Sequence, residues 1–156
     1  MLTIMKNSER RELKVKEYVN SLIGSYKHNN IDITLIDNDS IREKYYLKNK
    51  FYPEFFWYHK YDPKSFKNNF KPVYFKKEWN LFVQNINEYS KIYIFICNGD
   101  ITLFVNNPHD ISNLFDENFE YDQDLKLTNG LIIWNSKSND ALYIGDDVGL
   151  EFYKLI

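Results

Sequence analysis

The residue types that most often carry chemistry are few and scattered in this 156-residue chain. His28, His59 and His109 share no spacing typical of metal ligands, and the one cysteine, Cys97, cannot complete a structural zinc site. His109 could act as a general base that the neighbouring carboxylate of Asp110 orients. Both residues, however, fall at a predicted helix start, where helix capping explains them better. The five glycines form neither a dinucleotide-binding fingerprint nor a P-loop. We therefore expect no enzymatic activity, no cofactor and no metal.

The triplet Gly145-Asp146-Asp147 resembles the Gly-Asp-Asp motif of viral RNA polymerases, whose aspartates hold metal ions in a hairpin turn. That chemistry needs a third carboxylate on a neighbouring strand and a much longer chain. Glycine adopts positive φ readily, and aspartate hydrogen-bonds nearby backbone, so both are common in turns. The triplet therefore predicts a turn rather than a catalytic centre.

Acidic and aromatic residues gather between positions 115 and 124, and we call residues 116–124 the acidic segment. Its carboxylates, with those of Asp140, Asp146, Asp147 and Glu151, could form a negative face that docks a basic partner. Phe115 and the aromatic residues of the segment would serve as apolar anchors. The candidate partner-binding residues are Asp116, Glu117, Phe119, Glu120, Tyr121, Asp122, Asp124, Asp146 and Asp147. The alternative is a solvated acidic loop without a partner.

A second candidate surface is the stretch 44–77, where lysines alternate with aromatic residues. Lysines suit phosphates, and aromatic rings stack on bases, so this stretch is a candidate for nucleic-acid binding. Arginine, which makes most contacts to base edges, is nearly absent there, and the rest of the chain is acidic. The alternative is a packed connection in which lysine stems cover the aromatic side chains. We do not expect nucleic acid to be the principal partner.

Apolar periodicity predicts three helices and one short helix. The first carries a stripe from Val15 to Tyr26, the second starts at the capping box Ser40 to Glu43 and runs to Lys48, and the third spans Trp79 to Ile86. Asn107-Pro108 predicts a short helix that ends near Phe115.

Short apolar runs predict strands at 31–36, 92–97, 101–106, 131–135, 141–144 and 150–155. Asn98-Gly99 is a strong hairpin signal, and the later strands lie too close in sequence for helical crossovers, so they should pair antiparallel. Residues 49–75, interrupted by three prolines, are interpreted as a long packed connection. The expected fold is α+β: one domain over 1–156, with a mostly antiparallel sheet of five or six strands and three or four helices mainly on one face.

Composition points to an ordinary globular protein, with 44% hydrophobic and 27% charged residues. One cysteine cannot form an internal disulfide, no apolar signal-peptide region is seen at the N-terminus, and no apolar run is long enough to cross a membrane. We therefore expect a cytoplasmic protein without a membrane partner. The 18% aromatic content is compatible with a homodimer, although codon bias of an AT-rich genome also accounts for it.

Charge is separated along the chain. Residues 42–77 carry ten positive and three negative groups, whereas residues 78–156 carry four positive and thirteen negative groups. Such asymmetry bears on association with partners rather than on the fold.

In size, acidity and lack of catalytic motifs, the whole chain resembles the immunity proteins of bacterial contact-dependent growth inhibition and related polymorphic toxin systems. The resemblance implies a small cytoplasmic protein that neutralises one cognate toxin, commonly a basic nuclease, by covering its active site or a docking surface. It includes no diagnostic motif, so no family residue is carried over to this chain. The alternative function is a non-catalytic binding or regulatory module, associated with nucleic acid through the stretch 44–77.

Overall fold

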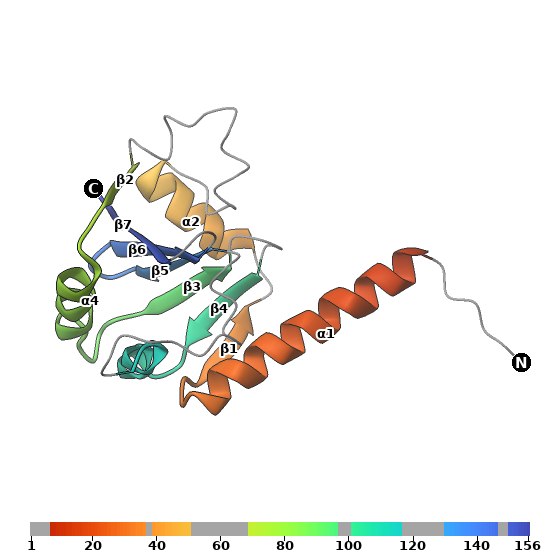
Figure 1. Ribbon diagram of the computed structural model, residues 1–156. Helices are drawn as coiled ribbons and strands as arrows, with labels where there is room; N and C mark the ends of the chain where they lie inside the picture. Colours follow the sequence, from red (N-terminus) through yellow and green to blue (C-terminus); the bar gives the residue numbers. More distant parts are fainter. Residues whose placement is uncertain (1–6, 37–38, 51–68, 97–100, 117–129, 147–149) are drawn as a thin grey trace, which may run out of the picture.

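Seven antiparallel strands form one sheet in the order β1-β4-β3-β5-β6-β7-β2 (Figure 1). The computed structural model describes residues 7–36, 39–50, 69–96, 101–116, 130–146 and 150–156. The predicted α+β class is confirmed, with seven strands in place of five or six. The strands are β1 (Ile33–Ile36), β2 (Phe70–Pro72), β3 (Ile92–Ile96), β4 (Ile101–Val105), β5 (Leu131–Asn135), β6 (Asp140–Asp146) and β7 (Leu150–Leu155).

The helices cover both faces of the sheet, with most of them on one face. They are α1 (Asn7–His28), α2 (Asp39–Asn49), α4 (Phe75–Gln84) and the 3-10 helix η2 (Pro108–Leu114). The larger core lies beneath α1, α4 and η2, where Leu22, Trp79 and Ile111 contact alternate residues of the central strands. The smaller core lies beneath α2, where Tyr45 meets the opposite face of the same strands.

Both faces of the central strands are buried, which explains why their sequences are almost continuously apolar. In β3, Ile92, Ile94 and Ile96 belong to the larger core, whereas Phe95 belongs to the smaller one. The register with β5 places Ile94 opposite Ile133 and Phe95 opposite Ile132, so each face continues across the sheet.

The segment interpreted as a packed connection contains a strand that periodicity did not reveal. Its end forms the edge strand β2, and the predicted third helix, α4, begins at Phe75, four residues before Trp79, and ends at Gln84. Three residues are too few to show alternation, and Pro72 argues against a strand unless that strand lies at an edge. β2 is indeed an edge strand that pairs only with β7 among the described residues.

The predicted turn at Gly145-Asp146-Asp147 is wrong for its first two residues, because both continue β6. Gly145 pairs with Glu151 and Asp146 pairs with Leu150, while Asp147 lies outside the described residues. The ring of Tyr143 lies over Gly145, where an added Cβ atom would sit 3.3 Å from the ring. Close approach of a neighbouring group is a common reason for glycine within a strand.

An arginine on α2 is buried against the sheet. Arg42 is 1% exposed, and its Nε donates a hydrogen bond to Thr102 Oγ1 at 3.0 Å. Its Nη2 donates to the carbonyl oxygens of Ile96 at 2.9 Å and Ile101 at 2.8 Å. These two residues face each other at the end of β3 and the start of β4. The guanidinium carbon also lies 5.4 Å from the ring centre of Phe95. Arg42 therefore connects α2 to the end of β3 and the start of β4.

The C-terminal end of α2 is tied to the turn between β5 and β6 by a reciprocal amide pair. Asn49 Nδ2 donates to Asn139 Oδ1 at 3.1 Å, and Asn139 Nδ2 donates back to Asn49 Oδ1 at 2.9 Å. The same Asn139 oxygen accepts a hydrogen bond from Trp134 Nε1 at 2.9 Å. The buried indole N–H is therefore satisfied, as burial of a tryptophan normally requires.

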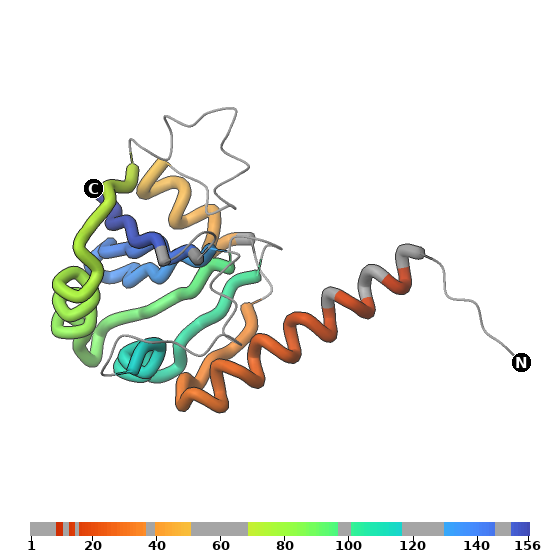
Figure 2. The backbone as a smooth tube through the Cα atoms, in the orientation of Figure 1, coloured from red at the N-terminus to blue at the C-terminus, as the bar shows by residue number. Residues whose placement is uncertain are grey.

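Helix α1 extends from the β1 edge of the sheet away from the body of the molecule (Figure 2). Its C-terminal residues Leu22 and Tyr26 are buried in the larger core, whereas Leu13 is largely exposed. Among the helices that the structure describes, none combines the length and apolar character needed to cross a membrane.

Candidate functional site

The structure describes only two of the nine candidate partner-binding residues. Asp116 is exposed directly after Phe115, which follows η2, and Asp146 ends β6 opposite Leu150. The other seven lie outside the described residues, so the acidic segment stays a sequence-based prediction: Glu117, Phe119, Glu120, Tyr121, Asp122, Asp124 and Asp147.

The expected role of Phe115 as a surface anchor is wrong. Phe115 is 5% exposed and belongs to the larger core. Its ring lies 4.8 Å from that of Phe75 and 5.1 Å from that of Trp79. Burial of a large ring against two others stabilises the fold, so this side chain cannot also bind a partner.

The described lysines and aromatic residues of the stretch 44–77 do not form one strip. Exposed lysines occur on α2, on β2 and on α4, and these elements lie on different faces or at the edge of the sheet. Tyr45 and Phe70 are buried in the smaller core, so their rings cannot stack on bases. Arg42, the one arginine of this region, is buried as well. Tyr46 and Tyr74 are exposed, so the described part of the stretch offers lysines and two exposed rings on separate elements rather than one continuous strip.

Polar residues near η2 have structural roles. Asn107 Oδ1 accepts a hydrogen bond from the backbone N–H of His109 at 3.3 Å, which confirms the predicted cap. Asp110 Oδ2 accepts one from the backbone N–H of Asp32 at 3.2 Å, so this carboxylate anchors the chain entering β1 instead of orienting His109. No group of three or more His, Cys, Asp or Glu in the described part of the chain converges to hold a metal ion.

Tyr26 is a strongly perturbed titratable group, but it lies within the core. Burial, and secondarily the neighbouring Tyr18, raises the pKa of its hydroxyl far above the ordinary range. The side chain is fully buried, and its hydroxyl has no hydrogen-bond partner among the residues that the structure describes. A permanently neutral phenol in an apolar core has no route to a substrate, so we assign Tyr26 a packing role.

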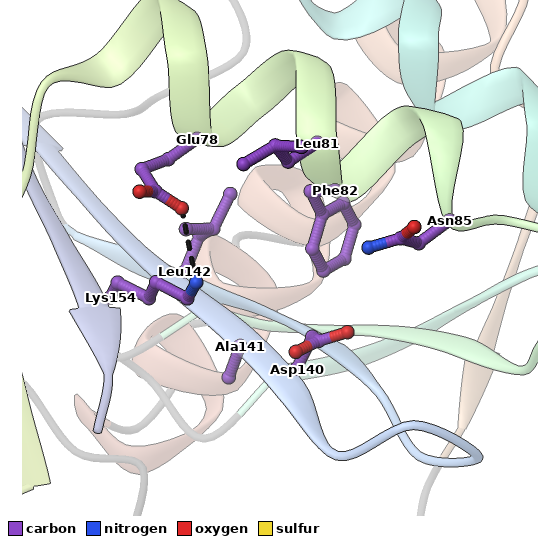
Figure 3. Close-up of a pocket in the computed structure, with 8 residues that line it drawn as sticks. All are labelled: Glu78, Leu81, Phe82, Asn85, Asp140, Ala141, Leu142 and Lys154. Atoms are coloured by element: carbon purple, nitrogen blue, oxygen red, sulfur yellow. Dashed lines mark ion pairs between the residues drawn. The ribbon is translucent and has the colours of Figure 1, made fainter.

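A shallow pocket lies between α4 and the strands β6 and β7 (Figure 3). We call it the α4–β6 pocket. Its space amounts to about 260 Å³, open solvent included. Phe82, Ala141 and Leu142 form its apolar part, and Leu81, 40% exposed, stands at its margin. The remaining lining residues are polar or charged: Glu78, Asn85, Asp140 and Lys154.

The charges at the two ends of the α4–β6 pocket differ. At one end Lys154 Nζ lies 3.1 Å from Glu78 Oε2, so this cation is already neutralised (Figure 3). At the other end Asn85 closes α4 and Asp140 begins β6, and neither side chain has a hydrogen-bond or ion-pair partner among the described residues. The pocket therefore has an excess of hydrogen-bond acceptors at the Asp140 end.

The turn that follows α4 presents an exposed tyrosine on a fixed backbone. Tyr89 is 73% exposed, yet its backbone N–H donates to Asn87 Oδ1 at 2.8 Å. The backbone N–H of Asn87 in turn donates to Ser90 Oγ at 3.0 Å, and Asn135 Nδ2 on β5 donates to the same oxygen at 3.2 Å. This turn is therefore held against the strand that precedes Asp140.

We define the α4 surface as Leu81, Asn85, Glu88, Tyr89 and Asp140, all of which are exposed or partly exposed. The acidic and aromatic pattern of the sequence predicted a binding surface at residues 116–124 and did not indicate this one. Glu88-Tyr89 between a helix and a strand is a weak signal, and only the packing of α4 against the sheet brings Asp140 and Asn85 to the same pocket.

Comparison of the chain with protein-family models, with curated proteins and with solved structures finds no match.

Proposed function

We propose that this protein is an immunity or inhibitor protein that binds a cognate bacterial toxin, in the simplest case a nuclease, and neutralises it in the cytoplasm. It acts by covering a basic surface with carboxylates and aromatic side chains, and it performs no chemistry of its own. The observation that carries the proposal is the α4 surface: Leu81 and Asp140 line one pocket, and the turn after α4 exposes Glu88 and Tyr89.

Aromatic residues on rigid backbone are the usual anchors of protein interfaces, because little conformational entropy is lost when they are buried. Tyr89 fits this pattern, since its turn is fixed by three hydrogen bonds. Carboxylates near such an anchor speed encounter with a basic partner and select against acidic ones. The thirteen acidic groups of residues 78–156 supply a negative field for the same purpose.

Tyr89→Ala should weaken binding to the toxin by about 2 kcal/mol or more, roughly thirtyfold in Kd, because a central aromatic anchor is lost. Stability should change by less than about 0.5 kcal/mol, since the side chain is 73% exposed. Tyr74→Ala is the matched control: Tyr74 is 77% exposed at the opposite end of α4, and its side chain makes no capping hydrogen bond. Calorimetric titration measures both affinities, and equal losses in the two variants would remove Tyr89 from the interface.

Reversal of the acidic segment, with lysine at Asp116, Glu117, Glu120, Asp122 and Asp124, should reduce the association rate at low salt by at least tenfold without unfolding the protein. The reason is that these charges would now repel a basic partner. Stopped-flow association kinetics at two salt concentrations test this prediction. An unchanged rate would exclude the acidic segment from the encounter surface and leave the α4 surface as the binding site.

The second candidate function is a binding module associated with nucleic acid, favoured by the exposed lysines of α2, β2 and α4. It predicts salt-dependent binding of labelled single-stranded RNA that is lost when Lys71, Lys76 and Lys77 are replaced by glutamine. The immunity proposal predicts no such binding at physiological salt, and fluorescence anisotropy separates the two.

A further inference from the structure

The outward side of α4 carries a row of exposed residues, which we call the α4 row: Tyr74, Lys77 and Leu81. These residues recur at the spacing of one helix face, away from the buried Trp79 and Phe82. Tyr74 is 77% exposed and Leu81 is 40% exposed. Because α4 lies at the margin of the molecule (Figure 1), the row is open to a second protein.

The end of the α4 row at the start of the helix is basic. Lys76 and Lys77 occupy the first turn, and both are exposed. Lys71, on the neighbouring strand β2, is exposed as well and lies opposite Lys154 in the register of β2 and β7. The carboxylate of the first turn, Glu78, is already engaged by Lys154 at 3.1 Å. The helix start also carries partial positive charge, so this end attracts carboxylates.

The other end of the α4 row is acidic. Asp140 and Asn85 line the same pocket as Leu81 (Figure 3), and Glu88 is exposed in the turn that follows the helix. The last turn of α4 contains no basic residue that would complement the partial negative charge of the helix end. Lysines at the start and carboxylates at the end are the reverse of the distribution that stabilises an isolated helix. An antiparallel neighbour with the same distribution complements both ends.

We infer that two copies of this protein associate through α4, with the two helices antiparallel and a two-fold axis at Leu81. A two-fold contact uses the same surface on both copies, so a surface that is basic at one end and acidic at the other complements itself. The two Leu81 side chains meet at the axis. Lys77 of one copy lies opposite Asn85 of the second copy, next to the Asp140 carboxylate that shares the pocket with Asn85.

A single pair of helices forms a small interface. It buries less than the roughly 800 Å² per partner of a standard interface, so the expected Kd of the dimer is about 10–100 μM. The dimer needs no toxin and therefore goes beyond the proposed function. Leu81 and Asp140 also belong to the α4 surface, so a second copy and a toxin exclude each other. A complex with the toxin then contains one copy of this protein.

Sedimentation equilibrium of the full chain measures the dimer without any other partner. Leu81→Lys should weaken it at least about tenfold, because two ammonium groups would meet at the axis. Lys77→Glu and Asp140→Lys should each weaken it about threefold to tenfold, since like charges would then face each other. The double variant Lys77→Glu/Asp140→Lys should restore the dimer, because opposite charges face each other again. Lys44→Glu, exposed on α2 at the opposite face of the sheet, is the control and should leave the dimer unchanged.

A monomer at every concentration up to about 1 mM would overturn the inference and leave the α4 surface to the toxin. A dimer that survives Leu81→Lys would also overturn it, as would a natively folded double variant that fails to restore the dimer. Growth of larger oligomers would contradict a two-fold contact, which closes on itself. Association in a mixture of the two single charge variants would support the inference, because each contact then joins opposite charges. Absence of a toxin would refute the proposed function and leave these results unchanged.

Discussion

Arg42→Ala is expected to lower the free energy of unfolding by about 3–5 kcal/mol, because it leaves buried acceptors without donors and opens a cavity. The guanidinium satisfies the carbonyl oxygens of Ile96 and Ile101 and the hydroxyl of Thr102, and these three groups lie at the junction of β3 and β4. The arginine is only 1% exposed and its three partners are buried as well, so its loss leaves these acceptors in a buried site. Urea unfolding followed by circular dichroism measures the loss.

Two further variants make the Arg42 result specific. Arg42→Lys keeps the charge but cannot reach all three acceptors with one ammonium group, so a loss of about 1–3 kcal/mol is expected. Lys44→Ala, on the same helix but exposed, should change stability by less than about 0.5 kcal/mol. A loss below about 1 kcal/mol for Arg42→Ala would show that water or another side chain replaces the guanidinium without cost.

The second large effect is expected for Trp134→Ala, which should destabilise the protein by about 3–5 kcal/mol. The side chain is 4% exposed and lies 5.2 Å from the ring of Tyr45 and 6.0 Å from that of Phe95, measured between ring centres. Its removal therefore leaves a large cavity where α2 meets the sheet. Thermal and urea denaturation measure the change.

Trp134→Phe is the milder variant, because it keeps one aromatic ring while it removes the bond to Asn139 and part of the buried indole. We expect a smaller loss of about 1–2 kcal/mol, since Asn139 retains its pairing with Asn49. If Trp134→Ala were as stable as the unaltered protein, the smaller core beneath α2 could not be packed as described.

The helices and most strands could be predicted because their signals are local. The apolar stripe of α1 and the alternation or apolar runs of β1, β3, β4, β5 and β7 depend only on neighbours in the sequence. β2 could not be predicted in this way, because three residues with a terminal Pro72 become a strand only when β7 offers an edge. The turn assigned to Gly145 was wrong for the same reason, since its pairing with Glu151 decides its conformation.

The burial of Arg42 was missed, although one signal existed. The chain contains three arginines against seventeen lysines, so an arginine three residues before Tyr45 on a predicted helix stands out. Its acceptors, however, are backbone carbonyls more than 50 residues away, and sequence alone does not place them. The α4–β6 pocket was missed for a similar reason, because Asn85 and Asp140 meet only through tertiary packing.

We propose that this protein neutralises a toxin by binding it. The most direct measurement is the growth of bacteria that express the adjacent upstream reading frame, first alone and then together with this protein. We expect growth arrest in the first case, rescue in the second, and co-purification of the two proteins at equal stoichiometry. If the upstream frame is not toxic, or if this protein neither relieves the toxicity nor binds the toxin, the proposed immunity function is wrong.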